Sequence, residues 1–271
     1  MKCRNWPVGV CSWSLQTDVP GVAKAMKKLG LQHVHLAIAG AIGSGGRQYL
    51  DAIKAQNWTI TSTMLNFAHE DYSTLDTIKI TGGIVPDEYW QGDRDLFIQA
   101  AEITAALGVK YLSMHAGFID ETDKAHAAKI TERIRTLADI AEENGVILLL
   151  ETGQETAGEL RHFLERLDHN SVGVNFDPAN MILYDKGNPI KAVHTLAPWI
   201  RHIHIKDALR TSEPGTWGTE VPWGDGQVGV AEFLRALEEV GYDGALAIER
   251  EAGDDRFGDI QKAVQRLAAA S

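Results

Sequence analysis

The sequence has little of what marks secreted, membrane or nucleic-acid-binding proteins. It has 2 cysteines in 271 residues and no CxxC pair, so we expect neither a disulfide framework nor a cysteine-type structural zinc site. No apolar run approaches the roughly 18 residues of a membrane span. The net charge of −11, with no basic run, argues against nucleic-acid and membrane partners. Residues 1–14 lack the apolar core of a signal peptide, so we expect a cytoplasmic protein.

What remains is the composition of an ordinary globular enzyme. Hydrophobic residues make up 44% of the chain and charged residues 23%, which excludes disordered and fibrous classes. The length would suit one large domain or two small ones. No linker, low-complexity tract or charge run divides the chain, and we therefore predict a single domain over residues 1–271.

Short apolar runs alternate with longer segments of helical period along the whole chain. Most of these runs are almost uninterrupted, which is typical of parallel strands covered on both faces. The helical segments carry apolar stripes, such as Ile130, Ile134, Leu137 and Ala141 before Asn144-Gly145. The predicted strands are Val8–Trp13, His33–Ile38, Thr59–Leu65, Lys110–His115, Val146–Glu151, Val172–Asp177, Ile200–Ile205 and Ala245–Glu249.

Eight strand–helix units in 271 residues predict an α/β fold of the (β/α)8 TIM-barrel type. A doubly wound open sheet is the alternative, but such a sheet usually has a glycine-rich fingerprint after its first strand. Here the first strand runs into CSWSLQ instead, which favours the barrel.

Two segments, 66–93 and 206–229, are too long to be simple connections, and both follow strand ends where barrel active sites form. The second contains Trp217 and Trp223 among glycines and prolines. We expect it to form part of a substrate-facing wall, with Trp223 as a substrate contact. The alternative is that both tryptophans pack against the barrel rim or a neighbouring subunit.

Residue types that bind metals stand at the ends of the last four predicted strands. Each has an ordinary explanation: a glutamate often lies at a helix N-terminus, and Asp177 before Pro178 could be a helix cap. In a closed barrel, however, these strand ends converge on one mouth. His202 and His204 share a face, and His204 lies nearer the rim. The predicted ligands are therefore Glu151, Asp177, His204 and Glu249.

Three carboxylates and one imidazole form a hard, oxygen-rich ligand set. Such a set suits one divalent cation, Mn²⁺ above all, with Mg²⁺ or Co²⁺ as alternatives and catalytic Zn²⁺ still open. His115, which ends the fourth predicted strand, is a candidate substrate contact; the alternative is a hydrogen-bonded core histidine.

At these residues the sequence resembles the sugar phosphate isomerase/epimerase family, xylose-isomerase-like TIM barrels that include ketose 3-epimerases and inosose dehydratases. The resemblance rests on LLLETGQET, GVNFDPANM, IRHIHIKDA followed by GDGQVG, and LAIERE. It implies one metal held by the four predicted ligands, with Glu151 and Glu249 as the acid/base pair. It also implies a substrate contact for Arg210, six residues after His204.

Two other positions near the ligands are candidate substrate contacts. Lys206 follows His204 in the same motif and could hold a substrate hydroxyl, carboxylate or phosphate; the alternative is a salt bridge to Asp207 or Glu151. Asn180 stands where ketose 3-epimerases carry a substrate-binding histidine, and we expect it to contact substrate.

Further positions separate this chain from particular branches of the family. Ala157 replaces a second glutamate of the ketose 3-epimerases, with Glu155 nearby, and His35 stands where an acidic residue often ends the second strand. The apurinic-endonuclease branch is excluded because its extra histidines are missing.

The predicted chemistry is proton abstraction beside a carbonyl through an enediolate, with one glutamate taking the proton and the other returning it. We therefore predict a metal-dependent isomerase or epimerase acting on a ketose or keto sugar. An inosose-type dehydratase (a lyase) using the same site is the alternative, followed by a non-catalytic carbohydrate-binding barrel. No phosphate cradle follows the last two strands, which favours an unphosphorylated sugar or cyclitol as the small-molecule partner. A homo-oligomer is compatible with the sequence.

Overall fold

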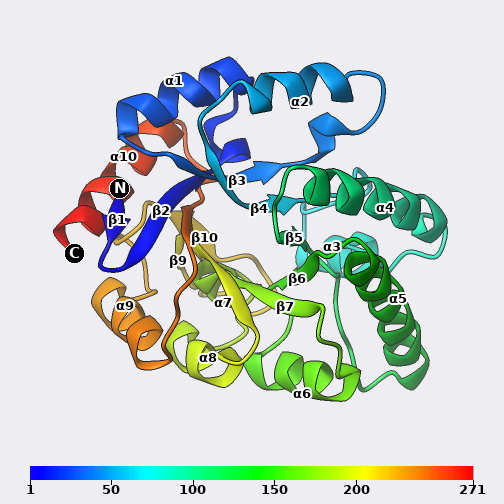
Figure 1. Ribbon diagram of the computed structural model, residues 1–271. Helices are drawn as coiled ribbons and strands as arrows, with labels where there is room; N and C mark the ends of the chain where they lie inside the picture. The colour runs from blue at the N-terminus through cyan, green and yellow to red at the C-terminus, as the bar shows by residue number, and fades with distance from the viewer. Residues whose placement is uncertain (271) are drawn as a thin grey trace.

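Eight parallel strands close into a barrel in the structure, a computed structural model that describes residues 1–270 (Figure 1). Neighbouring strands pair in chain order, and β11 closes the ring by pairing with both β8 and β2. The predicted single (β/α)8 barrel is confirmed. The barrel strands are β2 (Trp6–Cys11), β3 (His33–Ala37), β4 (Thr59–Met64), β5 (Tyr111–Met114), β6 (Ile147–Glu151), β7 (Val172–Phe176), β8 (Ile200–Ile205) and β11 (Leu246–Ile248).

The strands lie where the apolar runs predict them, with small differences at their ends. The largest difference is at β2, which was predicted to run to Trp13. It ends at Cys11 because Ser12–Leu15 turns into a short 3-10 helix, η1, that ends on Gln16 in the left-handed region. Trp13 therefore points from a turn at the mouth of the barrel and not from a strand.

Helices surround the sheet and bury their apolar stripes against it (Figure 1). All four stripe residues predicted from Ile130 to Ala141 are buried on α5. The capping box of Thr156 and Glu159 opens α6, as its sequence pattern predicts. The helices are α1 (Val19–Leu29), α2 (Gly46–Lys54), α3 (Leu75–Thr81), α4 (Trp90–Ala106), α5 (Lys124–Glu143), α6 (Ala157–Leu167), α7 (Pro178–Leu183), α8 (Pro189–Leu196), α9 (Val230–Glu239) and α10 (Arg256–Ala269), with a second 3-10 helix, η2 (Ala39–Ala41).

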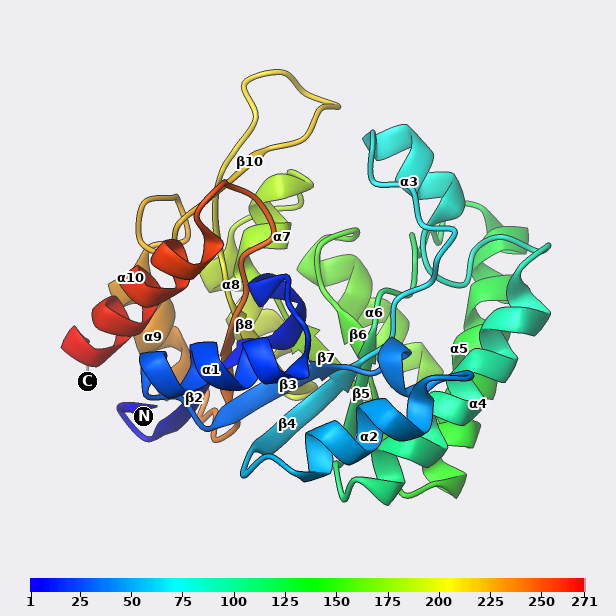
Figure 2. The same ribbon diagram turned by 90° about the horizontal axis from the view of Figure 1, so that it is seen from above.

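The two long segments rise on the same side of the barrel, above the carboxyl ends of the strands (Figure 2). The first carries α3. The second forms a hairpin of β9 (Asp207–Leu209) and β10 (Thr219–Val221) that pair antiparallel, as the short β1 (Lys2–Cys3) does with β2. Among residues 1–270, no helix combines the length and apolarity that a membrane crossing requires.

Candidate metal and active site

The four predicted metal ligands come together in the interior of the barrel. They lie in, or directly after, four strands that are neighbours in the sheet, in the order β11, β8, β7, β6. Glu249 follows β11, His204 lies in β8, Asp177 follows β7 and Glu151 ends β6. All four side chains are buried, and one ligand atom from each lies within 4.8 Å of the others. The glutamates therefore stand at the two ends of an arc, with His204 and Asp177 between them.

The Nδ1 atom of His204 lies at the centre of this arc. It is 3.5 Å from Oε1 of Glu151, 3.6 Å from Oδ2 of Asp177 and 3.3 Å from Oε2 of Glu249. Neither His204 Nδ1 nor Asp177 Oδ2 has a hydrogen-bond partner, although both are buried. Buried polar atoms are rarely left unpaired. Two such atoms beside two further carboxylates fit the coordination of a divalent cation.

The electrostatics of the group also favour a cation. Burial opposes a positive charge on His204, but Glu249, together with other acidic neighbours, holds the pKa of His204 well above its ordinary value. Burial raises the pKa of Asp177. Burial also works against the charge of Glu249, yet Lys206 and His204 hold the pKa of Glu249 well below its usual range. The protein thus concentrates negative charge where a bound cation would offset it.

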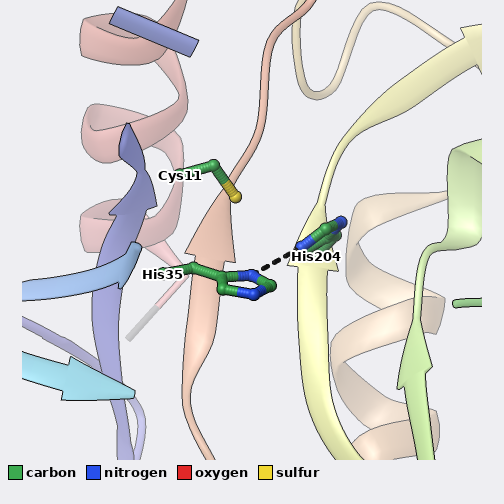
Figure 3. A group of neighbouring side chains, drawn as sticks. All are labelled: Cys11, His35 and His204. Atoms are coloured by element: carbon green, nitrogen blue, oxygen red, sulfur yellow. Dashed lines mark hydrogen bonds between the residues drawn. The ribbon is translucent and has the colours of Figure 1, made fainter. Parts of the chain in front are cut away.

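The other ring nitrogen of His204 is held by His35 of β3. His204 Nε2 lies 3.0 Å from His35 Nδ1 (Figure 3). Burial and the charge on His204 lower the pKa of His35 to about 3, so His35 is neutral and can accept the Nε2 hydrogen. That arrangement leaves His204 Nδ1 free to face the three carboxylates. The sequence marked His35 only as a departure from the family, and this role was not predicted.

Cys11 lies beside the two histidines (Figure 3). Burial raises the pKa of its thiol to about 12, so the sulfur is protonated at neutral pH. His202, the alternative to His204, also points into the barrel, where its Nδ1 lies 2.9 Å from Asn175 Oδ1. Of the two histidines, His204 was predicted as the ligand because it lies nearer the rim, and it is His204 that lies beside the carboxylates.

Each glutamate is positioned by neighbours. Trp13 Nε1 donates to Glu249 Oε1 at 2.7 Å, a contact that sequence reasoning missed. On the opposite side, Asn180 Nδ2 donates to Glu151 Oε1 at 3.0 Å, and His115 Nε2 lies 3.8 Å from the same oxygen. Asn180 and His115 thus contact a predicted ligand directly, and both line the cavity above it.

Lys206 also lies beside a predicted ligand, but its ion-pair partners differ from those expected. Its ammonium donates to Glu249 at 2.9 Å and to Glu251 at 2.7 Å, and lies 3.7 Å from Asp177. The alternative of a salt bridge to Asp207 or Glu151 is wrong. Asp207 turns away because its carboxylate accepts backbone N–H groups of the hairpin segment, at Ala208, Gly224, Gly226 and Val228.

A cavity of about 530 Å³ opens above these residues. Three of its lining residues, His115, Asn180 and Lys206, contact the predicted ligands, and the rest of the lining combines aromatic rings with polar side chains. Its lining comprises Asn66, Tyr72, His115, Asn180, Leu183, Tyr184, Lys206, Trp217, Gly218, Glu220, Glu251 and Ala252.

Two predicted substrate contacts lie outside this lining. Trp223 is 3% exposed and packs its ring against Phe233 of α9, because Asp207 draws the neighbouring backbone at Gly224 toward the sheet. Arg210 points to the segment after α7, where its guanidinium binds Asp185 and the carbonyl of Gly187. Trp217, and not Trp223, therefore lies in the cavity wall. Arg210 pairs with Asp185 and does not line the cavity.

Glu155, near the first ligand, gives a prediction about stability. Its buried carboxylate accepts the backbone N–H of Ile119 at 2.8 Å. Burial raises the pKa of Glu155 from 4.5 to about 7. The folded state thus binds this proton more tightly than the unfolded state. The resulting stabilisation is complete below pH 4.5 and is lost as the pH rises through about 7.

Glu155→Gln keeps an acceptor for Ile119 but cannot ionise. We expect its free energy of unfolding, relative to wild type, to rise by roughly 2 kcal/mol between pH 5 and pH 8. Urea denaturation at both pH values measures this, with the exposed Glu143→Gln as the matched control. An equal pH dependence in wild type and Glu155→Gln would show that the buried carboxylate does not set it.

Comparisons with known proteins agree with this geometry. The sequence model of a family described as xylose isomerase-like TIM barrel matches residues 22–270. A crystal structure of a xylose isomerase domain protein from Planctomyces limnophilus is similar, with 30% identity, a TM-score of 0.87, and coverage of 98% of this chain and 96% of that one.

The curated relatives include proteins with two kinds of named activity. An inosose dehydratase of Lacticaseibacillus casei is 23% identical over 185 residues, which cover 57% of this chain and 62% of the relative. A D-psicose 3-epimerase of Ruminiclostridium cellulolyticum is 29% identical over 125 residues, which cover 44% of this chain and 39% of the relative. The matches thus span less than two thirds of these relatives. With a match over nearly its whole length, the chain belongs to the xylose isomerase-like TIM barrel family.

Proposed function

We propose that this protein is a divalent-metal-dependent isomerase or epimerase of an unphosphorylated keto sugar, with Mn²⁺ as its metal. The observation that carries the proposal is the convergence of Glu151, Asp177, His204 and Glu249 on one buried point, with two of their atoms unpaired. The named activities of the relatives support this reaction class, because epimerisation and inosose dehydration both begin at a carbon beside a carbonyl.

The two glutamates perform the proton transfers. When bound, the cation supplies Lewis acidity that stabilises negative charge on the substrate oxygen. One glutamate removes a proton from the carbon next to the carbonyl, and the other delivers a proton to the opposite face or to the neighbouring carbon. The first outcome is epimerisation and the second is isomerisation. Their positions at the two ends of the ligand arc suit transfer on two faces.

The neighbours of the glutamates prepare them for these roles. Lys206 and Trp13 hold Glu249 through separate oxygens, which fixes its orientation. Asn175 and Asn180 do the same for Glu151, at 3.2 Å and 3.0 Å. A base held within hydrogen-bond reach by fixed donors loses little entropy when it meets the substrate.

A lyase is the second candidate, favoured by the inosose dehydratase among the relatives and by His115. Burial opposes protonation of His115, but Glu151 and other carboxylates raise the pKa of its imidazole. In a dehydratase, a glutamate removes the proton beside the carbonyl, a carbon–carbon double bond forms, and the β-hydroxyl leaves. A proton from an acid such as His115 makes the leaving group water.

Proton exchange in D₂O tests the proposal. Protein loaded with Mn²⁺ is incubated with a panel of ketoses, keto sugars and inososes, and deuterium entry into each compound is followed by NMR. We expect deuterium to enter beside the carbonyl of at least one substrate only when metal is present. A rearranged sugar of unchanged mass apart from deuterium indicates an isomerase or epimerase, whereas loss of water indicates the lyase. Exchange at the same rate in metal-free protein, or none with metal bound, would contradict the proposal.

A further inference from the structure

The β9–β10 hairpin, which forms one wall of the cavity, is fixed to the end of α7 and to the segment that follows it. The backbone N–H of Gly218 donates to the carbonyl of Leu183 at 3.0 Å. Beside this bond, the rings of Trp217 and Tyr184 meet edge to face, with centroids 4.6 Å apart. Arg210 adds its contacts to Asp185 and Gly187. Three kinds of contact therefore hold Trp217 in one place.

The hairpin is also fixed on its other side. Glu220 of β10 accepts from Arg250 Nη1 at 2.7 Å and from the backbone N–H of Glu251 at 3.0 Å. Arg250 in turn donates to Asp259 at 3.0 Å. Both ion pairs of Arg250 are largely buried, with side-chain exposures of 12% or less. Trp217 thus belongs to a wall that is formed before any ligand binds, which lowers the entropic cost of binding.

The two ends of the cavity have different chemistry. At the inner end, His115, Asn180 and Lys206 contact the predicted ligands through hydrogen bonds or ion pairs. The rest of the lining, called the outer end here, presents the rings of Tyr72, Tyr184 and Trp217 and the side chain of Leu183. It also includes three polar residues, Asn66, Glu220 and Glu251. Tyr72 rises from the segment before α3 and lies edge to face with His115, at 6.0 Å between centroids. The polar end suits the reacting sugar, and the aromatic end suits an apolar or ring-shaped group.

The lysine and carboxylate side chains of the cavity lining are already paired. Lys206 is the one lysine or arginine in the part of the lining that the structure describes, and Glu249 and Glu251 both accept from it. The two carboxylates of the lining, Glu220 and Glu251, are paired with Arg250 and Lys206. The described lining therefore has no unpaired lysine, arginine or carboxylate for a charged group at the outer end. A group bound there is therefore uncharged.

The volume of the cavity also bears on what binds at the outer end. A cavity of about 530 Å³ lies in the range that holds drug-sized ligands. A single hexose is smaller than such a ligand, so a hexose at the inner end leaves part of the cavity for a second group. We propose that the outer end, formed by Tyr72, Leu183, Tyr184 and Trp217, is a second subsite that binds an uncharged ring attached to the reacting sugar. The substrate is then a glycoside, such as an oxidised aryl glycoside or disaccharide, and not a free monosaccharide. This inference rests on the proposed function of the inner site.

Binding of unreactive probes tests the subsite without turnover. Titration calorimetry compares phenyl β-D-glucoside with methyl β-D-glucoside on wild-type protein loaded with Mn²⁺. We expect the phenyl glucoside to bind about tenfold more tightly, because its second ring contacts the aromatic end. Trp217→Ala should remove this preference while the Mn²⁺ affinity stays unchanged. The matched variant Trp217→Phe keeps an aromatic face and should retain most of the preference.

Each outcome of the comparison is decisive. Equal affinities for the two glucosides in wild type, or a preference unchanged in Trp217→Ala, would overturn the subsite and leave the proposed function of the inner site standing. If neither glucoside binds to metal-loaded protein, the subsite is overturned, and D₂O exchange on free keto sugars then decides the inner site separately. A Trp217→Ala variant with altered Mn²⁺ affinity would assign Trp217 to the structure of the metal site and would also overturn the proposal.

Discussion

Glu249→Gln is expected to slow C–H exchange in the substrate by about 10²–10⁴-fold, the usual contribution of a general acid or base. The change is isosteric, so the side chain can still accept from Trp13, which donates to Glu249 Oε1. An amide cannot take a proton from carbon at neutral pH. It also places N–H groups beside Lys206, whose ammonium now donates to Glu249 Oε2 at 2.9 Å. Deuterium wash-in followed by NMR measures the effect.

The metal content of Glu249→Gln must be measured on the same sample, because Glu249 is also a predicted ligand. Glu251→Gln is the matched control: it removes the other carboxylate from Lys206 but lies outside the ligand group. We expect Glu251→Gln to keep most of the exchange rate. Full exchange in a metal-replete Glu249→Gln variant would eliminate Glu249 as the base.

The second large effect is expected from Asp177→Asn, which should weaken Mn²⁺ binding by an order of magnitude or more. The two carboxylate oxygens of Asp177 have different roles. Oδ1 caps α7 by accepting from the backbone of Ala179 at 2.8 Å and Asn180 at 3.0 Å. Oδ2 faces His204 without a hydrogen bond. Asparagine can keep the cap with its oxygen and presents an amide nitrogen, a poor metal ligand, in place of Oδ2.

Calorimetric titration with Mn²⁺ measures this loss, and urea denaturation of the apo protein provides the control. We expect the apo Asp177→Asn variant to unfold near the wild-type midpoint, since the cap remains. Asp177→Ala loses both roles and should also lose stability, by about 1 kcal/mol for the cap. Wild-type Mn²⁺ affinity in Asp177→Asn would remove Asp177 from the ligand set.

The fold was predictable because its signals are local and repeated. Parallel strands buried on both faces, such as the run that forms β6, are uninterrupted apolar sequences with few alternatives. Strand ends were less predictable, as at Trp13, where η1 replaces the expected continuation of β2. The end of a strand depends on which turn the following residues adopt, and CSWSLQ contains no glycine or proline to mark that turn.

The predicted ligands also followed from local rules, because strand direction and side-chain alternation place residues at a known end and on a known face. The residues around them did not. Trp13 reaches Glu249 across 236 positions, and His35 reaches His204 across 169. These contacts exist because the closed barrel brings η1, which follows β2, beside β11, and lets side chains of β3 and β8 meet in its interior. A histidine inside the apolar run HVHLA was the available signal for His35.

Trp217 and Trp223 show a further limit. They lie in the same stretch rich in glycine and proline, and composition does not distinguish them. Their positions differ because Asp207 accepts the backbone N–H of Gly224 and holds that part of the loop against the sheet. Trp223 therefore packs on Phe233, whereas Trp217 lines the cavity. Such a choice depends on hydrogen bonds formed only in the folded chain.

Anomalous X-ray scattering from crystals grown with Mn²⁺ tests the proposed four-residue metal site directly. We expect one strong anomalous peak per chain among the side chains of Glu151, Asp177, His204 and Glu249, and its disappearance after treatment with a chelator. No peak among these four residues at a Mn²⁺ concentration that supports activity, or a peak held by other residues, would contradict it.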